Sequence, residues 1–264
     1  MGVSLTDLSP LLPLLREAPF GLVTDLDGTI SPLTGTPAEA TVSPACRRHL
    51  EAIAARVALV AVVSGRTVAE ARRIVGLKGI VYVGLHGFSL AMPPVWSEAA
   101  MATYTVLAGG ILDGLRRTIA LPGIVFEDKG PLIALHYRQA ADPAAARQAI
   151  LDAIAAAPMA ARFARHEGKM FVELRPPIPS VNKGAAVRHL ATERGLRSVL
   201  YLGDDSTDID AFRALHEATT FRSASVVVAG EETPPEVRAE ADYRVEGVAG
   251  VEWLLGEVAG ALGA

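Results

Sequence analysis

The chain has 264 residues, is 50% hydrophobic and carries a formal net charge of -4. This is enough apolar material for one large or two small domains with a buried core. The charge balance and the absence of a lysine or arginine run argue against a nucleic-acid partner. The longest apolar runs have the length of a strand and are too short to cross a membrane. Cys46 is the single cysteine, which fits a reducing compartment. We therefore expect a soluble, cytoplasmic protein with no membrane partner.

Strand-length apolar runs alternate with helical patterns along most of the chain. Residues 11–15 predict a short helix packed on the core. The runs that predict strands cover residues 20–24, 58–63, 80–83, 199–202 and 225–229, and the helical patterns cover residues 46–56, 67–75 and 185–194. This alternation predicts an α/β fold in which helices cover both faces of a doubly wound parallel sheet. Such sheets place their chemistry at the carboxyl ends of the strands.

The middle of the chain has a different order of elements. After a helical stretch, residues 124–129 and 132–138 predict two strands around a Gly-Pro turn, residues 144–156 predict a helix, and two further strands follow. This order is typical of a compact α+β unit. We therefore expect a core domain made of residues 1–104 and 180–264, and an inserted α+β domain made of residues 105–179.

Asp25 and Asp27 directly follow the predicted strand at residues 20–24. Their spacing puts both carboxylates on one side of the strand end, where they repel unless a cation or a proton intervenes. A bare Asp-Gly pair is most often an ordinary turn. A calcium loop of the EF-hand type is excluded, because Gly28 falls at the fourth loop position and Thr36 stands where the bidentate glutamate belongs. The strand before this pair and the clusters after it favour a functional site.

A second acidic cluster follows the predicted strand at residues 199–202. Asp204, Asp205 and Asp208 stand where a helix begins, and capping that helix needs only one of them. If this loop lies beside Asp25 and Asp27, two carboxylates at ~4 Å repel by about 4 kcal/mol at an effective dielectric constant of 20. A divalent cation removes this repulsion, and Mg²⁺ suits a site of a few carboxylate oxygens and a substrate phosphate best.

Two other strand and helix ends offer groups that suit a phosphoryl oxygen. Ser64, Gly65 and Arg66 provide a hydroxyl, accessible backbone amides and a helix N-terminus. Lys183 provides a cation before the predicted helix at residues 185–194. Each of these motifs is weak by itself, since a lone serine or lysine is usually solvated surface.

Taken together and in this order, the four motifs resemble the haloacid dehalogenase superfamily of phosphotransferases. The resemblance covers the chain outside the insert and implies a core of that fold with an inserted α+β cap. It implies that Asp25 attacks phosphorus and forms an aspartyl-phosphate, and that Asp27 acts as general acid and then as general base. It further implies phosphate contacts from Ser64 and Lys183, a Mg²⁺ site formed by Asp25, Asp204 and the backbone carbonyl of Asp27, and support of that site by Asp205 and Asp208.

The insert carries polar residues that suit a polyol. Glu127 and Lys129 share a face of one predicted strand, and in the strand at residues 169–174 Lys169, Phe171 and Glu173 alternate with apolar residues. Carboxylates and ammonium groups together satisfy both the donor and the acceptor capacity of a hydroxyl. The bland alternative is a solvated sheet face with ordinary surface ion pairs.

The motifs of the insert, together with those of the core, resemble the motifs of the trehalose-6-phosphate phosphatases in order and spacing over nearly the whole chain. The residues that carry the resemblance are Gly84 to Gly87, Glu127 to Gly130, Leu135 to Arg138, Lys169 with Glu173 to Pro176, Asn182 to Gly184, and Gly203 to Asp208. The resemblance implies hydrolysis of trehalose 6-phosphate, with the sugar hydroxyls bound by Glu127, Lys129, Lys169 and Glu173. Arg66 would help to fix the phosphate-bearing sugar. It also suggests a functional pairing with a trehalose-6-phosphate synthase.

Two positions depart from the pattern of that family. Ile209 stands where the family usually has a glutamate, and Ser89 replaces a glutamate after the Gly-x-His-Gly motif. Both lie outside the expected nucleophile and metal ligands. The alternatives are a sucrose- or glucosylglycerol-phosphate phosphatase of the same superfamily, a phosphomutase, and a non-catalytic sugar-binding module. A phosphomutase would need an additional anion-binding motif in the insert, and a non-catalytic scaffold has no need of the Asp25 and Asp27 pair.

Overall fold

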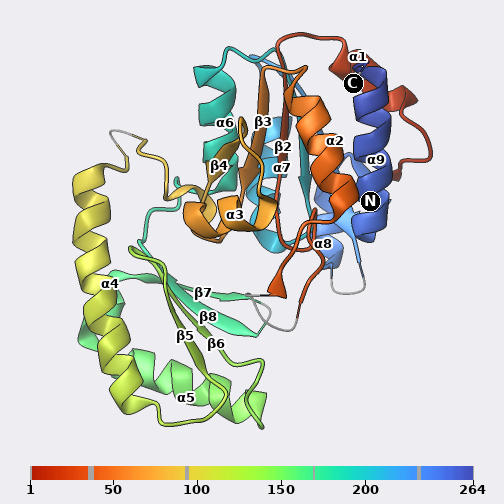
Figure 1. Cartoon of the computed structure of the whole chain (residues 1–264). Helices are drawn as coiled ribbons and strands as arrows, with labels where there is room; N and C mark the ends of the chain where they lie inside the picture. Colours follow the sequence, from red (N-terminus) through yellow and green to blue (C-terminus); the bar gives the residue numbers. More distant parts are fainter. Residues whose placement is uncertain (1, 35–38, 93–94, 169, 231–232, 264) are drawn as a thin grey trace. The chain divides into compact units, whose positions relative to one another are not determined.

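The chain folds into two compact units (Figure 1). The computed structural model describes residues 2–34, 39–92, 95–168, 170–230 and 233–263. Unit 1 comprises Met1–Leu90 and Val181–Ala264, and unit 2 comprises Ala91–Ser180. The second division thus falls next to the expected boundary at residues 179 and 180. Residue 105, expected at the first boundary, lies within helix α4 (Glu98–Thr118) of unit 2.

Unit 1 is built around a parallel sheet, which has seven strands in the described part of the chain. Their order is β1 (Val3–Ser4), β11 (Tyr243–Glu246), β10 (Arg222–Ala229), β9 (Ser198–Gly203), β2 (Phe20–Thr24), β3 (Leu59–Val63) and β4 (Val81–Val83). From β2 the chain moves outward through β3 to β4, and after unit 2 it returns on the other side of β2 with β9. The direction of winding therefore reverses between β2 and β9, and ligands bind at such a point in open α/β sheets.

Helices cover both faces of this sheet, as the alternation in the sequence predicted. One face packs against α1 (Leu12–Leu15), α2 (Pro44–Ala54), α3 (Val68–Val75) and α9 (Gly247–Ala261). The other packs against α6 (Lys183–Glu193), α7 (Ile209–His216) and α8 (Pro235–Glu240). Both faces are buried, so neighbouring residues of a strand enter opposite cores: Leu22 lies in the first and Val23 in the second. The doubly wound α/β fold is confirmed.

The helices that follow β3 and precede β9 begin at defined caps. The Thr67 hydroxyl accepts from the backbone amide of Glu70, and the Glu70 side chain accepts from that of Thr67, which starts α3. At α6 the side chain of Asn182 accepts from the amide of Ala185. These caps fix the loop that carries Ser64 and Arg66 and the start of α6, where Lys183 is the first residue.

Unit 2 is a four-stranded antiparallel sheet in the described residues, with helices on one face. Its order is β5 (Val125–Asp128), β6 (Ile133–His136), β8 (Phe171–Arg175) and β7 (Ala164–Gly168), and it packs on α4 and α5 (Pro143–Ala155), with a 3-10 turn at Pro158–Arg162. Ile133, Leu135, Val172 and Leu174 point into the core with the helices. Glu127, Ala134 and Glu173 are paired in register across three strands, and their side chains share the opposite face.

Some elements differ from their predicted positions. Strand β8 begins at Phe171, because Met170 has φ of 62° and leaves the extended conformation. Lys169 lies outside the described residues. Strand β11 was not predicted from the sequence, since in four residues it buries only Val245, and β1 is a two-residue strand beside it. Both are therefore too short and too polar to show a strand pattern.

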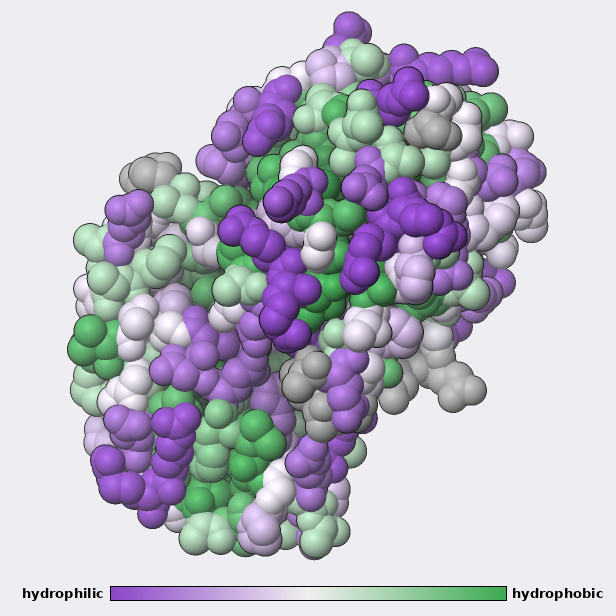
Figure 2. All heavy atoms as spheres, viewed as in Figure 1, coloured by the Kyte–Doolittle hydropathy of each residue, from purple (hydrophilic) through white to green (hydrophobic). Residues whose placement is uncertain are grey.

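No helix in the described ranges is both long enough and apolar enough to cross a membrane. The face of the molecule shown in Figure 2 is a mixture of hydrophilic and hydrophobic residues. Single exposed apolar side chains, such as Val106 on α4, are ordinary on protein surfaces.

Candidate active site

The loop after β2 brings Asp25 to the point where the sheet reverses its winding. The backbone amide of Asp25 donates to the carbonyl of Leu202 on β9 at 2.8 Å, so the two strand ends remain side by side beyond the sheet. Gly28 then turns the chain with φ of 82°. A Cβ at this position would lie 2.1 Å from Oδ2 of Asp204, so both the turn and the approach of Asp204 require glycine.

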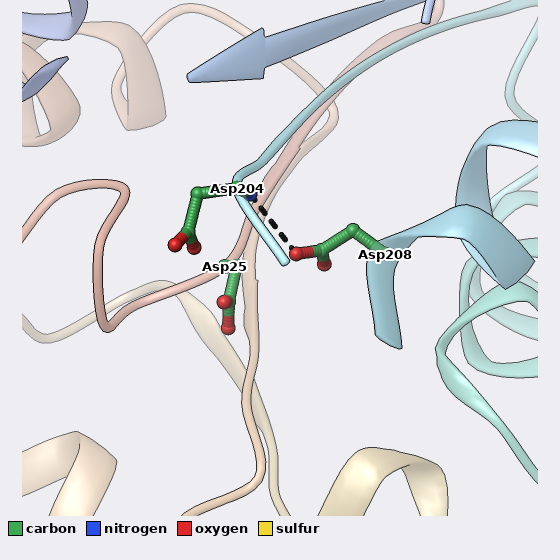
Figure 3. Close-up of side chains that lie close together, drawn as sticks. All are labelled: Asp25, Asp204 and Asp208. Atoms are coloured by element: carbon green, nitrogen blue, oxygen red, sulfur yellow. Dashed lines mark hydrogen bonds between the residues drawn. The ribbon is translucent and has the colours of Figure 1, made fainter. Parts of the chain in front are cut away.

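Asp25, Asp204 and Asp208 form a buried acidic cluster (Figure 3). Each offers an oxygen that lies within 4.8 Å of the others. Burial raises the pKa of Asp25 to about 8, although the Lys183 ammonium opposes this shift. Burial, followed by the charges of Asp25 and Asp208, raises the pKa of Asp204 well above its ordinary value. The two acidic loops thus meet at these residues, which is the condition on which the hypothesis of a cation site depends.

Asp208 differs from the other two because donors surround both of its oxygens. Oδ1 accepts from Lys183 Nζ at 2.7 Å and from the Tyr201 hydroxyl at 2.6 Å. Oδ2 accepts from the backbone amides of Asp204 and Asp205, each at 3.0 Å. Asp208 therefore shapes the loop and holds Lys183, and it has little capacity left to bind a cation.

The geometry and chemistry of Asp25 and Asp204 fit a divalent cation. Both carboxylates are almost fully buried, at 5% and 3% exposure, and this burial raises the pKa of each, so a nearby divalent cation would favour their ionised forms. All the side-chain oxygens offered are hard ligands. The Thr29 hydroxyl donates to Oδ1 of Asp204 at 3.2 Å and so orients it. Thr29, which ends the motif that begins at Asp25, and Tyr201, whose hydroxyl contacts Asp208, are supporting residues whose roles were not predicted from the sequence.

Lys183 lies between the nucleophile candidate and Asp208. Its Nζ is 3.1 Å from Asp25 and 2.7 Å from Asp208, and the side chain is 2% exposed. Burial alone would lower its pKa, but the attraction of Asp208 and Asp25 outweighs burial and raises the pKa of Lys183. The ammonium is therefore a fixed positive charge beside Asp25, as a phosphate-binding group must be.

Ser64 is buried at the end of β3, next to β2 in the sheet. Its backbone amide donates to Val83 and its carbonyl accepts from His86, which ties it to the turn after β4. Its hydroxyl accepts from the amide of Arg66 at 3.2 Å. The serine is thus held at the same edge of the sheet as Asp25.

Arg66 makes a contact that the sequence did not suggest. Its Nε and Nη2 each lie 2.7 Å from an oxygen of Asp27, in a two-pronged ion pair. The Asp27 side chain is 31% exposed, unlike the buried Asp25. In this structure Arg66 therefore orients Asp27, in addition to any contact with a substrate.

The polar face of unit 2 gathers three of the residues expected to bind sugar. Lys129 Nζ lies 3.5 Å from Glu127 Oε2 and 3.3 Å from Glu173 Oε2. Two neighbours, His136 and Arg175, lie in motifs that carry the family resemblance but were assigned no role from the sequence. His136 Nε2 is 2.7 Å from Glu127 Oε2, and Arg175 Nε is 3.5 Å from Glu173 Oε1. Lys169, expected in the same group, is outside the described residues.

The remaining predicted residue and the two departures have structural roles. Asp205 accepts from the amide of Ser206 at 2.7 Å and starts a 3-10 turn at Ser206–Asp208. The Ser89 hydroxyl accepts from the amide of Gly84 at 2.7 Å, which closes the turn that holds Ser64. Ile209 begins α7 and packs against the second core of unit 1. Ser89 thus affects the packing of a loop, and Ile209 the packing of a helix on the core.

The chain is similar in sequence to known proteins over most of its length. The family model described as trehalose-phosphatase matches residues 23–249. A trehalose-phosphate phosphatase from Mycobacterium marinum is 37% identical over 72% of this chain and 50% of its own length. An uncharacterized glycosyl hydrolase from Mycobacterium tuberculosis is 33% identical over 91% of this chain and 18% of its own length. The chain thus spans half or less of these two relatives.

Solved structures show the same fold. The C-terminal domain of trehalose-6-phosphate phosphatase from C. albicans superposes with a TM-score of 0.74 over 98% of each chain, at 22% sequence identity. Because the family model covers most of the chain, including both acidic loops and the whole of unit 2, the chain belongs to the trehalose-phosphatase family.

Proposed function

We propose that the chain is a Mg²⁺-dependent phosphatase that hydrolyses trehalose 6-phosphate to trehalose and phosphate. The observation that carries the proposal is the placement of Asp25, which lies between the Lys183 ammonium and the buried Asp204. A nucleophile, a cation for the phosphoryl group and a metal site are together what hydrolysis of a phosphate monoester needs. Family membership and the polar face of unit 2 support the sugar substrate.

In the proposed reaction Asp25 attacks phosphorus and the bond to the sugar oxygen breaks, which leaves an aspartyl-phosphate. Asp27 gives its proton to the leaving sugar oxygen and later takes a proton from the water that attacks the aspartyl-phosphate. To do so, Asp27 must exchange its contact with Arg66 for the reacting oxygen. Lys183 and Ser64 would hold the phosphoryl oxygens throughout.

The proposed Mg²⁺ site consists of Asp25, Asp204 and the backbone carbonyl of Asp27. Asp205 and Asp208 would support it through the loop, as their hydrogen bonds suggest. Mg²⁺ is the preferred ion because a few carboxylate oxygens leave coordination positions for water and a substrate phosphate. When bound, the ion neutralises negative charge on the phosphoryl oxygens.

We further propose that unit 1 is the catalytic domain and that unit 2 acts as a cap that recognises the sugar through Glu127, Lys129, Lys169 and Glu173. Arg66 would contribute to the phosphate-bearing sugar after releasing Asp27. A trehalose-6-phosphate synthase would supply the substrate and is therefore the proposed functional partner.

A panel of sugar phosphates tests the proposal. Purified protein with Mg²⁺ should release phosphate from trehalose 6-phosphate with a higher kcat/KM than from sucrose 6-phosphate, glucosylglycerol phosphate or glucose 6-phosphate. Faster hydrolysis of another member of the panel would overturn the substrate but leave the mechanism in place. Phosphate transfer between two positions of one sugar, without release, would identify a phosphomutase instead.

A further inference from the structure

His136 lies at one end of a charged network on the polar face of unit 2, which consists of His136, Glu127, Lys129, Glu173 and Arg175. It is the last residue of β6, and its register partners are Val125 on β5 and Phe171 on β8. Its ring lies 5.7 Å from the Phe171 ring, between centroids, so packing restrains its orientation. The His136 and Glu127 side chains are each 22% exposed, which leaves the pair accessible to a ligand.

Among the contacts of Glu127, Lys129, His136, Glu173 and Arg175 that the structure describes, that between His136 and Glu127 is the shortest. Nε2 of His136 lies 2.7 Å from Oε2 of Glu127, whereas Lys129 Nζ is 3.5 Å from that oxygen and is shared with Glu173. The Glu127 carboxylate is thus fixed mainly from the side of the histidine. Lys129 in turn bridges to Glu173 across Ala134, whose methyl side chain leaves room for it.

The chemistry of the pair determines which ring nitrogen carries a proton. Burial opposes ionisation of Glu127, but the hydrogen bond from His136 and the charge of Lys129 outweigh it and lower the pKa of Glu127 to about 2. An ionised carboxylate only accepts hydrogen bonds, so Nε2 of His136 must be the donor.

We infer that His136 is a positioning residue for sugar selection: it holds Oε2 of Glu127, so that Oε1 is presented to a sugar hydroxyl in one fixed orientation. The inference deepens the proposed function and rests on it, since it assumes that Glu127 contacts the sugar. His136 could have two other roles, in which it binds the sugar directly or only packs against Phe171, and these are the alternatives to be tested.

A double-mutant cycle between His136 and Glu127 tests the inference. In His136→Ala, kcat/KM for trehalose 6-phosphate should fall about tenfold, mostly through KM, because a hydrogen bond to an ionised group is worth about this factor. The kcat/KM for p-nitrophenyl phosphate, which has no sugar, should change less than about twofold. His136→Gln, whose amide nitrogen occupies a place similar to Nε2, should recover most of the loss.

The double variant His136→Ala with Glu127→Gln separates the three roles. If His136 acts through Glu127, the double variant is no worse than Glu127→Gln alone. Losses that multiply would show that His136 binds the sugar directly and would overturn the inference. Equal losses on both substrates, together with a lower melting temperature, would show a packing role and would also overturn it.

Arg165→Ala is the matched control, because Arg165 lies on β7 of the same sheet but is paired in register with Leu174, whose side chain faces the helices. It should leave both substrates unchanged. A measurement that does not depend on activity is the rate at which the proton on Nε2 of His136 exchanges with water, followed by ¹⁵N NMR of histidine-labelled protein. This proton should exchange faster with water in Glu127→Gln, and unchanged exchange would contradict the contact.

Failure of the proposed function gives a different result. If another sugar phosphate is preferred, the same cycle is measured with that substrate, and the coupling between His136 and Glu127 should remain. If Glu127→Gln itself affects sugar and aryl phosphates equally, the proposed sugar contact fails, and the inference fails with it.

Discussion

The acidic cluster of unit 1 and the polar face of unit 2 both concentrate charge, but they balance it differently. In unit 1, Asp25 and Asp204 are buried together and both have raised pKa values, with Lys183 as the nearest cation to Asp25. On the polar face of unit 2, the carboxylates of Glu127 and Glu173 each have a basic neighbour: His136 lies beside Glu127, and Lys129 and Arg175 lie beside Glu173. The first region is thus short of positive charge and suits a metal ion, whereas the second is balanced and suits a neutral polyol.

The largest expected effect tests the catalytic side of this comparison. Asp25→Asn should abolish hydrolysis of both trehalose 6-phosphate and p-nitrophenyl phosphate, by about 10³-fold or more, because an amide cannot act as the nucleophile. Steady-state phosphate release measures this loss. Circular dichroism should show a folded protein, because Lys183 keeps its ion pair with Asp208 when the Asp25 carboxylate becomes an amide. Near-normal turnover would rule out Asp25 as nucleophile.

Removal of the metal tests whether the acidic cluster of unit 1 needs a bound cation. EDTA should stop turnover of both substrates, and added Mg²⁺ should restore it and raise the melting temperature. Because the pKa of Asp25 is raised to about 8, protons compete with the cation below this pH. Mg²⁺ affinity measured by calorimetry should therefore rise from pH 6 to pH 8. An affinity that does not depend on pH would contradict the shared, partly protonated cluster.

A substitution on the polar face of unit 2 should affect the hydrolysis of trehalose 6-phosphate but not that of p-nitrophenyl phosphate. Glu173→Gln keeps the shape of a fully buried side chain but removes the charge that faces Lys129. We expect kcat/KM for trehalose 6-phosphate to fall about 10- to 100-fold, while that for p-nitrophenyl phosphate stays within about twofold, because only the sugar substrate uses this contact. The control is Arg147→Ala, an exposed residue of α5 in the same unit. Equal losses on both substrates would remove the distinction between the units.

The smallest expected effect concerns acid stability. The folded protein lowers the pKa of Glu127 from 4.5 to about 2, so the ionised carboxylate stabilises the fold above pH 4.5. This contribution, of about 3 kcal/mol at most, is lost as the pH falls from 4.5 towards 2. Urea unfolding at pH 6 and pH 3 measures it. In Glu127→Gln the difference between the two pH values should shrink, and an unchanged difference would refute the assigned pKa.

The sequence was most informative where function depends on neighbours along the chain. Asp25, Asp27 and Asp204 follow predicted strands, and the rule that parallel strands end at one edge was sufficient to bring the two acidic loops together. The alternation in residues 171–174 likewise predicted the polar face of unit 2.

The side-chain contacts that support the acidic cluster could not be predicted in this way. Tyr201 lies in the middle of an apolar strand, so the sequence predicts only a core residue, yet its hydroxyl donates a hydrogen bond to Asp208. Thr29 reads as part of a turn, yet it orients Asp204 across 175 residues of sequence. The pairing of Arg66 with Asp27 depends on side-chain conformation, which no periodicity reveals.

The place of β2 in the sheet has a consequence for how the chain folds while it is being synthesised on the ribosome. Strand β3 can pair with one side of β2 early, and β4 with β3, but the other side of β2 stays open until β9 has been made, after the whole of unit 2. Contacts between segments this far apart form slowly. Asp25 and Asp204 are therefore kept apart during most of synthesis, and their repulsion arises only when β9 closes the sheet. A nascent chain that ends before residue 198 should fold much of unit 2 yet bind no cation at Asp25.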